Sequence, residues 1–421
     1  MLDIHFIRNN PTVVADAAKK KNIAIDIDNL LAIDTKYRLS LTSLESLRAE
    51  KNQLTKRFST AHDISQKHTL QQESTQLKEA IQLAEQNVIS LKNEIDTILL
   101  TVPNIPSTLS PIGIDDTANS VVKRVGSVPT FNFSPRDHIT LLELNDWADF
   151  GRVAKVSGSR TYALKGRLAL LEQALLLYVT KKIAAKGFTP ITVPSFARHS
   201  AFKNTGHFPA GQEDVFHVEK DEFYLTGTAE VILTSFHSNE ILDEQQLPIL
   251  YSGISPCFRR EAGSAGRDVR GLMRVHQFNK VEQLVISKND EIESERMHQL
   301  LLMNAQELLN DLELHYQVIE CSTGDMGAGK FRQNDIEVWV PSFGGYRETH
   351  SCSTFHSWQA RRANIRYRDR EGNIHFVHTL NNTAIASPRI FVSLLENYQT
   401  AEGRVKIPDC LRHYFDNDLY L

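Results

Sequence analysis

The chain has 421 residues, 41% of them hydrophobic and 23% charged, which is the size and composition of a globular protein with two or three domains. Its formal net charge of −4 excludes a general attraction to nucleic acid, so any site for a polyanion must be local. Four cysteines lie far apart without a Cys-x-x-Cys pair, which argues against a disulfide framework or zinc knuckle and favours a reducing compartment.

Neither a signal peptide nor a membrane span is expected. The first residues lack the apolar core of a signal peptide. The most apolar run, residues 168–179, is too short to cross a bilayer and contains Glu172. The sequence therefore predicts a cytoplasmic protein without a membrane partner.

Two heptad series follow the N-terminus. Apolar residues recur at steps of three and four from Leu30 to Phe58 and again from Leu70 to Ile98, interrupted by polar residues only at Ser40, Lys51 and Ser74, which places each series on one stripe of a helix. The polar stretch 59–68 between them is typical of a turn. The pattern predicts an antiparallel coiled-coil hairpin over about residues 30–100, each helix roughly 40–50 Å long.

The two predicted helices differ in charge. Residues 36–67 carry seven Lys and Arg against three acids, whereas residues 69–98 carry two against five. This pattern fits the solvated faces of a coiled coil, and it also fits a basic helix that meets a phosphate backbone. Composition alone does not separate these two interpretations.

A proline-rich segment, residues 102–111, ends the second helix and marks a domain boundary, because proline removes backbone donors. We therefore predict an N-terminal domain over residues 1–105 and a second domain over 106–421, in which short strands and helices alternate. Pro190 and Pro194 within the latter are typical of an edge strand or an interface.

The segment 223–233 is expected to be a strand in which Thr228 and Glu230 share one face. Two polar side chains in an otherwise apolar strand are costly to bury unless they meet a ligand or each other. A ligand site and a purely structural role remain equally open at this point.

Residues 258–284 predict a long antiparallel hairpin with a loop over about residues 262–271. Strand parity places Arg259 and Glu261 on one face before this loop. After the loop, the residues on one face are Arg274, His276, Phe278, Lys280 and Glu282. Guanidinium groups donate in pairs to phosphate oxygens. The cluster favours a nucleotide site, with a surface hairpin of Arg–Glu pairs as the alternative.

Glu348 and Ser351 are three residues apart on a predicted strand, so both can face one site only if the strand bulges between them. A carboxylate and a hydroxyl near polyphosphate are oxygen ligands of the kind that Mg²⁺ prefers. Further along, Pro388 fits the first turn of a helix. Arg389 would then lie near the helix N-terminus, where the dipole attracts anions.

No P-loop or Rossmann fingerprint is present, so those nucleotide sites are disfavoured. The segment 258–282 instead closely resembles motif 2 of the seryl-tRNA synthetases, a family of class II aminoacyl-tRNA synthetases. The resemblance covers essentially the whole chain, and further segments match in chain order: "PNIP", "TGTAE", "TGDMGAG", "DIEVW", "RETHSCS", "WQARR" and "LLENYQ".

The resemblance implies an α+β fold, with the antiparallel sheet of class II synthetases flanked by helices and an N-terminal antiparallel coiled-coil arm. It further implies that residues 1–105 form a tRNA-binding domain and residues 106–421 the catalytic domain. The protein would be a homodimer with Pro194 at its interface, and the arm would bind the long variable arm of tRNA(Ser).

The family's functional residues carry over by motif. For ATP the resemblance implies Arg259, Arg260, Glu261, Val275, Phe278, Glu348, Thr349, His350, Ser351 and Arg389. For serine it implies Thr228, Ala229, Glu230, Arg259, Glu282 and Thr383. For Mg²⁺ it implies Glu348 and Ser351, and for tRNA we expect Arg48, Lys51, Lys56, Arg57, Arg267 and Arg270.

Within these sets the resemblance assigns roles. Arg259, Arg389 and Glu348 would be catalytic, with Arg259 on the α-phosphate and the serine carboxylate and Arg389 on the γ-phosphate. Glu261 would contact the adenine amino group and Phe278 would stack on the ring. Serine's amino and hydroxyl groups would meet Glu282 and Thr383.

The implied activity is ATP- and Mg²⁺-dependent activation of L-serine to seryl-adenylate, followed by transfer to tRNA(Ser), with tRNA(Sec) left open as a second acceptor. The alternative is a catalytically silent homologue that serves as an RNA-binding or scaffolding module. A homologue that loads a carrier protein is disfavoured, because such proteins typically lack the arm. Motif 3 departs from the usual "NGSG" to "NNTA", although Thr383 keeps a hydroxyl.

Overall fold

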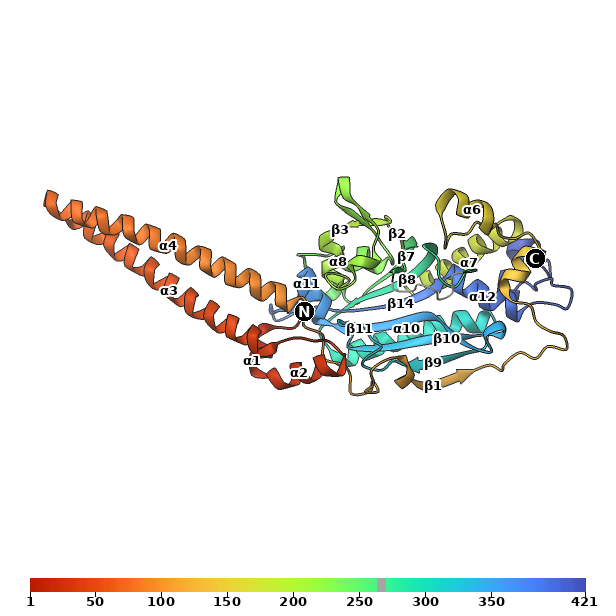
Figure 1. Ribbon diagram of the computed structural model, residues 1–421. Coiled ribbons are helices and arrows are strands. Elements are labelled where there is room, and N and C mark those ends of the chain that lie inside the picture. Colours follow the sequence, from red (N-terminus) through yellow and green to blue (C-terminus); the bar gives the residue numbers. More distant parts are fainter. Residues whose placement is uncertain (263–269) are drawn as a thin grey trace. The chain divides into compact units, whose positions relative to one another are not determined.

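The computed structural model describes residues 1–262 and 270–421 and divides into two compact units. One unit comprises Leu2–Lys19 and Ile23–Val102. The other comprises Pro103–Leu421 together with Met1 and Lys20–Asn22. The fold is α+β, with an eight-stranded, mostly antiparallel sheet and a long N-terminal helix pair, as predicted (Figure 1). Among the described helices, none is both long and apolar enough to cross a membrane.

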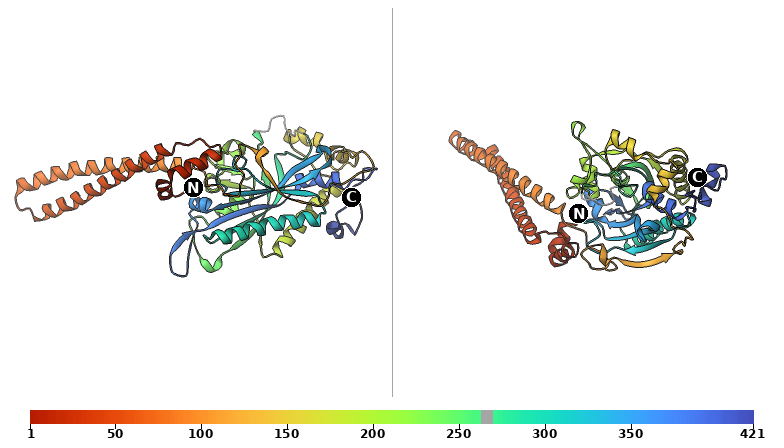
Figure 2. Two further views of the ribbon diagram at one scale, coloured as in Figure 1. Left: turned by 90° about the horizontal axis from the view of Figure 1, so that it is seen from below. Right: turned by 45° about the vertical axis from the view of Figure 1, so that its right-hand side comes forward.

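The N-terminal unit is helical. Its elements are α1 Ile4–Asn9, α2 Pro11–Lys20, α3 Ile27–Thr60 and α4 Ile64–Leu99. The last two run side by side in Figures 1 and 2. The heptad positions Leu30, Leu44, Leu70 and Ile81 are buried, so the predicted apolar stripes form the seam of the hairpin.

The connector of this hairpin is shorter than the sequence indicated. We expected a turn over residues 59–68, but α3 continues to Thr60 and α4 begins at Ile64. The Asp63 carboxylate accepts a hydrogen bond from the Ser65 amide at 3.3 Å and so caps α4. Because Asp63 caps its N-terminus, α4 begins inside the stretch that we had assigned to the turn from its polar composition.

A buried carboxylate ties α1 to α3. Asp34 accepts two hydrogen bonds from Arg8 at 2.7 Å and one from Arg38 at 3.1 Å. Burial raises the pKa of Asp34, but the two guanidinium groups outweigh it and the net shift is downward. Its contribution to stability is therefore present above the unfolded pKa of about 3.9 and is lost as the pH falls through the lower folded pKa.

We predict that Asp34→Asn lowers the free energy of unfolding of the N-terminal helices by about 1–3 kcal/mol at pH 7, because it removes the buried negative charge that pairs with Arg8 and Arg38. Urea denaturation followed by far-UV circular dichroism measures this loss. The matched control is Asp96→Asn, which breaks the exposed Lys92–Asp96 pair within α4 and should change stability by less than about 0.5 kcal/mol. Equal effects of the two substitutions would contradict the assignment.

The second unit is built on the large sheet. In spatial order its strands are β1 Ser120–Val125, β9 Tyr316–Glu320, β10 Arg332–Val340, β11 Gly345–His356, β14 His378–Ala386, β8 Gln277–Ser287, β7 Ile249–Phe258 and β2 Thr189–Thr192. Neighbouring strands are antiparallel except β2 and β7, which are parallel. Pro190 lies in β2 at the edge of the sheet, as its sequence predicted.

Smaller elements surround this sheet. Two three-stranded sheets comprise β13 Ile374–Phe376, β12 Arg366–Arg368 and β6 Ile241–Asp243, and β3 Phe196–Arg198, β5 Phe223–Leu225 and β4 His217–Val218. The helices are α5 His138–Leu144, α6 Phe150–Ser157, α7 Gly166–Ala184, α8 His199–Thr205, α9 Glu230–Ser235, α10 Glu291–Asp311, α11 Ser357–Ala363 and α12 Ser387–Asn397.

Strand parity separates the two faces of the large sheet. Val281, Val338, Cys352 and Leu380 belong to one apolar core together with residues of α7, α10 and α12. The helix α10 lies along the sheet in Figures 1 and 2 and contacts β8, β11 and β14. Because side chains alternate along a strand, the neighbouring polar residues point to the opposite face, where a site can form.

Two local predictions were wrong. Residues 223–233 are not one strand, since β5 ends at Leu225 and α9 begins at Glu230. Ala229 already has helical backbone angles, which places Glu230 in the first turn of a helix. The extended pattern of "FYL" therefore does not continue through the glycine-containing segment that follows it.

The loop of the second hairpin is longer than we predicted. We expected it over about residues 262–271, but β7 ends at Phe258 and β8 begins at Gln277. Pairing extends one step further, where the Arg259 amide donates to the His276 carbonyl at 2.9 Å. Glu261 has a φ of +53°, which breaks the extended path. Parity therefore does not relate Glu261 to Arg259.

Candidate active site

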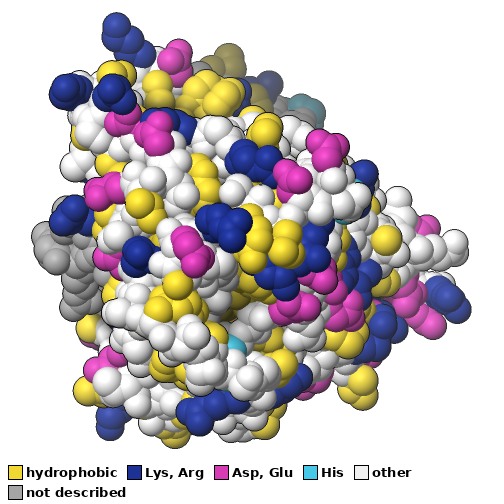
Figure 3. Space-filling view, turned by 90° about the vertical axis from the view of Figure 1, so that its right-hand side faces the viewer, with side chains coloured by type: hydrophobic (Ala, Val, Ile, Leu, Met, Phe, Trp, Pro, Cys, Tyr) yellow, Lys and Arg dark blue, Asp and Glu magenta, His cyan; other side chains and the backbone are white. Residues whose placement is uncertain are grey.

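The open face of the large sheet forms the floor of a cleft of about 730 Å³. Its walls come from β8, β10, β11 and β14, from the turn after α8, and from residues 327–330. On the molecular face in Figure 3, Lys and Arg side chains are interspersed with Asp and Glu. This mixture agrees with the net charge of −4 and with polyanion binding confined to local sites.

One end of the cleft carries a carboxylate between arginines. In the register of β10 and β11, Ile336 lies opposite His350 and Glu337 lies opposite Glu348, so Thr349 is an extra residue. This is the predicted bulge, and it allows Glu348 and Ser351 to line the same cleft. Arg389, at the start of α12, lies 3.3 Å from the Glu348 carboxylate.

The positively charged side chains near this end of the cleft lower the pKa of Glu348. Removal from water raises the pKa of its carboxyl, but the charges of Arg389, Arg259 and Lys330 outweigh that effect and lower it. An ionised carboxylate beside several cations is suited to hold a metal–polyphosphate ligand, in which both signs of charge occur.

Arg259 and Phe278 lie together in the middle of the cleft. The Arg259 guanidinium carbon is 5.2 Å from the centre of the Phe278 ring, and both residues line the wall. Glu261 pairs with Arg274 at 3.0 Å. An apolar ring next to a guanidinium and a carboxylate can accommodate a base, a phosphate and an amino group.

The other end holds a buried polar cluster. Glu282 is fully buried and forms an ion pair with Lys280, which also donates to the Thr228 hydroxyl at 2.8 Å. Asn381 donates to Glu282 at 2.9 Å and to Glu230 at 3.2 Å. Among the described residues, the buried Oδ1 of Asn381 has no hydrogen-bond partner, so an acceptor is available to a ligand.

Glu230 is the second buried carboxylate of this cluster, 7% exposed. Burial and then the nearby Glu282 raise its pKa, opposed by a hydrogen bond from Gln359 and by the charges of Lys280 and Lys330. Its direct donors are the neutral amides of Gln359 and Asn381. The site therefore suits a small ligand that brings a cationic, hydrogen-bonding group to Glu230.

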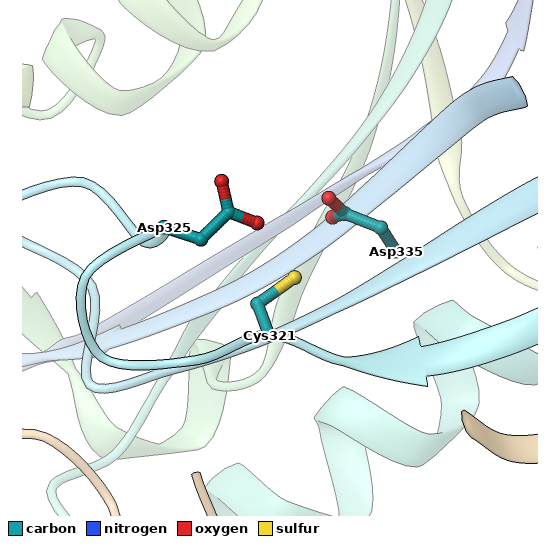
Figure 4. Close-up of side chains that lie close together, drawn as sticks. All are labelled: Cys321, Asp325 and Asp335. Carbon is teal, nitrogen blue, oxygen red and sulfur yellow. The ribbon is translucent and has the colours of Figure 1, made fainter. Parts of the chain in front are cut away.

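A third acidic group borders the cleft, where ligand atoms of Cys321, Asp325 and Asp335 lie within 4.8 Å of one another (Figure 4). Gln333 donates to Asp335 at 2.8 Å and to Ser351 at 3.2 Å. Burial and Glu348 raise the pKa of Asp335 to about 6. Burial and Asp335 raise the pKa of the Cys321 thiol, which stays protonated, so the oxygen donors suit a cation better than the sulfur does.

Most of the predicted ATP and serine residues line the cleft. They are Thr228, Glu230, Arg259, Glu261, Val275, Phe278, Glu282, Glu348, Thr349, Ser351, Thr383 and Arg389. Three others lie elsewhere. Arg260 is exposed and donates to the Glu213 carbonyl, His350 is buried and contacts the Ala384 carbonyl at 3.0 Å, and Ala229 is fully buried.

The residues predicted to bind tRNA have varied surroundings. On α3, Arg48 and Arg57 pair with Glu85 and Glu73 of α4 at 2.7 and 3.8 Å. Lys51 and Lys56 are exposed, as is Arg270. Arg267 lies outside the described residues. The cross-helix pairs agree with the solvated coiled-coil interpretation for two of the four arm residues.

Sequence reasoning did not assign site roles to Lys280, Asn381 and Gln359. Strand parity had placed Lys280 on one face with Glu282, although without a role in the site. Asn381 lies two positions before Thr383 on β14, so parity could have placed it on the cleft face as well. Gln359 lies on α11, which follows β11, within the matched segment "WQARR", but nothing in that local sequence links its side chain to Glu230.

The fold and the cleft together define a class II aminoacyl-tRNA synthetase. Residues 215–398 match the family described as "tRNA synthetase class II core domain (G, H, P, S and T)". Residues 1–106 match the "Seryl-tRNA synthetase N-terminal domain".

Full-length relatives narrow the class. The serine–tRNA ligase of Deinococcus radiodurans is 47% identical, over 98% of this chain and 97% of its own length. Seryl-tRNA synthetase from Pyrococcus horikoshii, solved with ATP, is similar with a TM-score of 0.92 and 38% identity, covering 100% and 99% of the two chains. The cytoplasmic enzyme of Naegleria fowleri, solved with AMP, has a TM-score of 0.88 and 28% identity, covering 100% and 98%.

The chain belongs to the seryl-tRNA synthetase family, whose members are ATP-dependent serine–tRNA ligases. The family, fold class and enzyme class predicted from the sequence are thereby confirmed.

Proposed function

We propose that this cleft forms seryl-adenylate from L-serine and ATP and that the protein then transfers the seryl group to tRNA(Ser). One observation carries the proposal. A single cleft joins a buried carboxylate–lysine–amide cluster at one end to a carboxylate, a hydroxyl and an arginine at the other, with Arg259 between them. The buried cluster suits an amino acid, and the other end of the cleft suits a nucleoside triphosphate.

ATP would lie from Phe278 to Arg389. In this arrangement the adenine stacks on Phe278, Glu261 accepts from its amino group, and Arg259 donates to the α-phosphate. Arg389, near the N-terminus of α12, would bind the γ-phosphate, supported by the dipole and free amides of that helix end. The solved relatives that carry ATP and AMP support a nucleotide in this cleft.

Serine would occupy the buried end. Its ammonium group would meet Glu230 and Glu282, its hydroxyl Thr383 and Glu282, and its carboxylate Arg259. Because alanine would leave these buried polar groups without a partner, the site should reject it strongly.

The donor set also fits Mg²⁺, since Glu348 and Ser351 present oxygen ligands to one cleft, and Asp335, the register partner of Ser351 on the neighbouring strand, lines the same cleft. When bound, the ion would neutralise charge on the triphosphate. In this mechanism the serine carboxylate is the nucleophile, so none of the described cleft residues has to act as one. Their role is to hold the serine carboxylate in line with the α-phosphate and to stabilise the charge that develops there, through Arg259 and Arg389.

The proposal also assigns a role to each domain and an oligomeric state. Residues 1–105 would bind tRNA and residues 106–421 would carry catalysis. Two copies of the chain would associate through a surface that includes Pro194. The acceptor would be tRNA(Ser), with tRNA(Sec) to be tested beside it, and the reaction would take place in the cytoplasm. The serine–tRNA ligases to which the chain is similar support the acceptor and the amino acid.

Amino-acid-dependent ATP–pyrophosphate exchange tests the function directly. We expect exchange with serine and at most about one hundredth of that rate with alanine, glycine or threonine at equal concentration. A protein that is folded, as judged by circular dichroism, but shows no exchange with serine would refute the proposal.

Glu348→Gln tests the cation site. We predict that this variant loses about 10- to 100-fold in serine-dependent exchange and needs more Mg²⁺ for half-maximal rate, since it replaces an anionic ligand with a neutral one. The control is Glu337→Gln, the register partner of Glu348, whose carboxylate accepts from Gln317 at 2.7 Å. If both variants shift the Mg²⁺ requirement equally, the assignment to Glu348 is wrong.

A further inference from the structure

One amide side chain behind the buried end of the cleft connects three elements. Gln359 of α11 is 1% exposed. Its Nε2 donates to the Glu230 carboxylate at 2.8 Å and to the Thr205 carbonyl at 3.1 Å, and its Oε1 accepts from the Thr379 hydroxyl at 2.6 Å. Both N–H groups and the carbonyl oxygen therefore have partners, which fixes the orientation of the amide.

This amide is the closer of the two neutral donors to Glu230. Gln359 donates to one carboxylate oxygen at 2.8 Å, and Asn381 donates to the other at 3.2 Å. The Asn381 amino group is shared with Glu282 at 2.9 Å, whereas among described carboxylates Gln359 donates to Glu230 alone. Gln359 is not part of the cleft wall, so it acts on a ligand through its bonds to the cleft residues Glu230 and Thr205, and Glu230 is the one with a charge.

The charges around Glu230 come from several elements. β8 supplies Lys280 and Glu282, and the segment before β10 supplies Lys330. From α11 and β14 come the neutral Gln359 and Asn381. His207, which follows α8 and lines the same cleft, has a pKa lowered to about 4 by burial and by nearby cations, so its ring is neutral near pH 7.

Glu230 must be ionised to bind an ammonium group, yet burial and Glu282 both favour its protonated form. A hydrogen bond donated to the carboxylate stabilises the ionised form, and bonds to charged groups are about twice as strong as those between neutral groups. The Gln359 bond therefore has an effect on charge as well as on orientation.

We propose that Gln359 is a positioning residue for serine binding, which holds the Glu230 carboxylate in the orientation and charged form that the serine ammonium group requires. This inference rests on the proposed function, in which Glu230 contacts serine. By joining Thr205 at the end of α8 to Thr379 on β14, the same amide fixes the wall of the cleft behind Glu230.

The test is Gln359→Met in the full-length protein, which keeps the length and apolar volume of the side chain and removes the donors. We expect the KM for serine in pyrophosphate exchange to rise about 10- to 100-fold, while the KM for ATP changes less than about threefold. The loss should grow as the pH is lowered, because a weaker bond raises the pKa of Glu230 further and so favours its protonated form.

Gln359→Glu provides a second variant of nearly the same size. Its added carboxyl opposes the charge on Glu230, so we expect a loss of serine affinity at least as large as that of Gln359→Met at neutral pH. Should Gln359→Met fail to fold, as judged by circular dichroism, this variant carries the test.

The matched control is Gln283→Met. Gln283 is fully buried on β8, donates to the Leu301 carbonyl and accepts from Asn304 at 2.8 Å, away from Glu230. It should lose stability without a selective, pH-dependent rise in the KM for serine. Equal effects of Gln359→Met on both substrates, at every pH, would overturn the inference. A wild-type protein without serine-dependent exchange would instead refute the proposed function.

Discussion

Arg259→Lys is expected to reduce serine-dependent pyrophosphate exchange by about 10³- to 10⁴-fold, the largest loss of any single substitution in the cleft. Lysine keeps the positive charge but presents a single ammonium group, whereas a guanidinium donates two parallel hydrogen bonds to phosphate oxygens. The proposed geometry needs both donors, because Arg259 must hold the α-phosphate and the serine carboxylate together. The loss should therefore fall on kcat as well as on both KM values.

The environment of Arg259 supports this central role. Its guanidinium stands over Phe278 at 5.2 Å, and its charge lowers both the pKa of Glu348 at one end of the cleft and that of His207 at the other. Replacing it therefore changes the electrostatics of both substrate ends at once.

The neighbouring residue supplies the control. Arg260→Lys makes the same chemical change one position away, on an exposed side chain that donates to the Glu213 carbonyl. We expect exchange within about twofold of wild type. A near-normal rate for Arg259→Lys, or the same large loss in both variants, would contradict the assignment of Arg259 to the reacting groups.

The sequence could predict those parts of the structure in which the spacing of residues along a helix or strand determines the direction of their side chains. The heptads of α3 and α4 place Leu44 and Ile81 on the seam whatever the rest of the chain does. On β11, the three-residue spacing of Glu348 and Ser351 required a bulge, and the register with β10 shows it at Thr349. For the coiled coil, the helical period was sufficient to predict which residues are buried. For β11, the expectation that Glu348 and Ser351 face one site was sufficient to predict the bulge.

Prediction of side-chain direction failed where the backbone departs from the extended strand that the sequence pattern indicated. Glu230 was expected beside Thr228 on a strand, but the chain turns after Leu225 and presents Glu230 from the first turn of α9. Glu261 was placed by parity with Arg259, yet its positive φ redirects it before the loop. Both residues still line the cleft, because their positions depend on tertiary packing rather than on strand parity.

Other features depend on contacts between distant segments, which one sequence does not encode visibly. Gln359 bonds to Glu230 across 129 positions and to Thr205 across 154. Asn381 bridges two carboxylates from different elements. The composition of α11 gives no sign of these partners, since a buried glutamine can satisfy its amide in many ways.

Removal of the arm should separate the two halves of the reaction. In a variant in which residues 36–98 are replaced by a short Gly/Ser linker, we expect serine-dependent exchange within about threefold of wild type. Transfer of serine to tRNA(Ser), measured as kcat/KM for tRNA, should fall at least about 10²- to 10³-fold, because phosphate contacts supply much of the affinity of such complexes. Equal loss of both activities would show that the arm has another role.

A finer version of this experiment leaves the arm in place and asks whether its basic helix meets phosphate. Lys51 and Lys56 are exposed on α3, so Lys51→Ala/Lys56→Ala should weaken tRNA binding and flatten its dependence on salt concentration by about one to two units in the log–log slope. Lys78→Ala, on the more acidic α4 and equally exposed, is the matched control and should leave the slope unchanged. If the double variant behaves like Lys78→Ala, the excess of positive charge on α3 reflects only the solvated surface of a coiled coil, and the tRNA contacts of the arm must come from other residues.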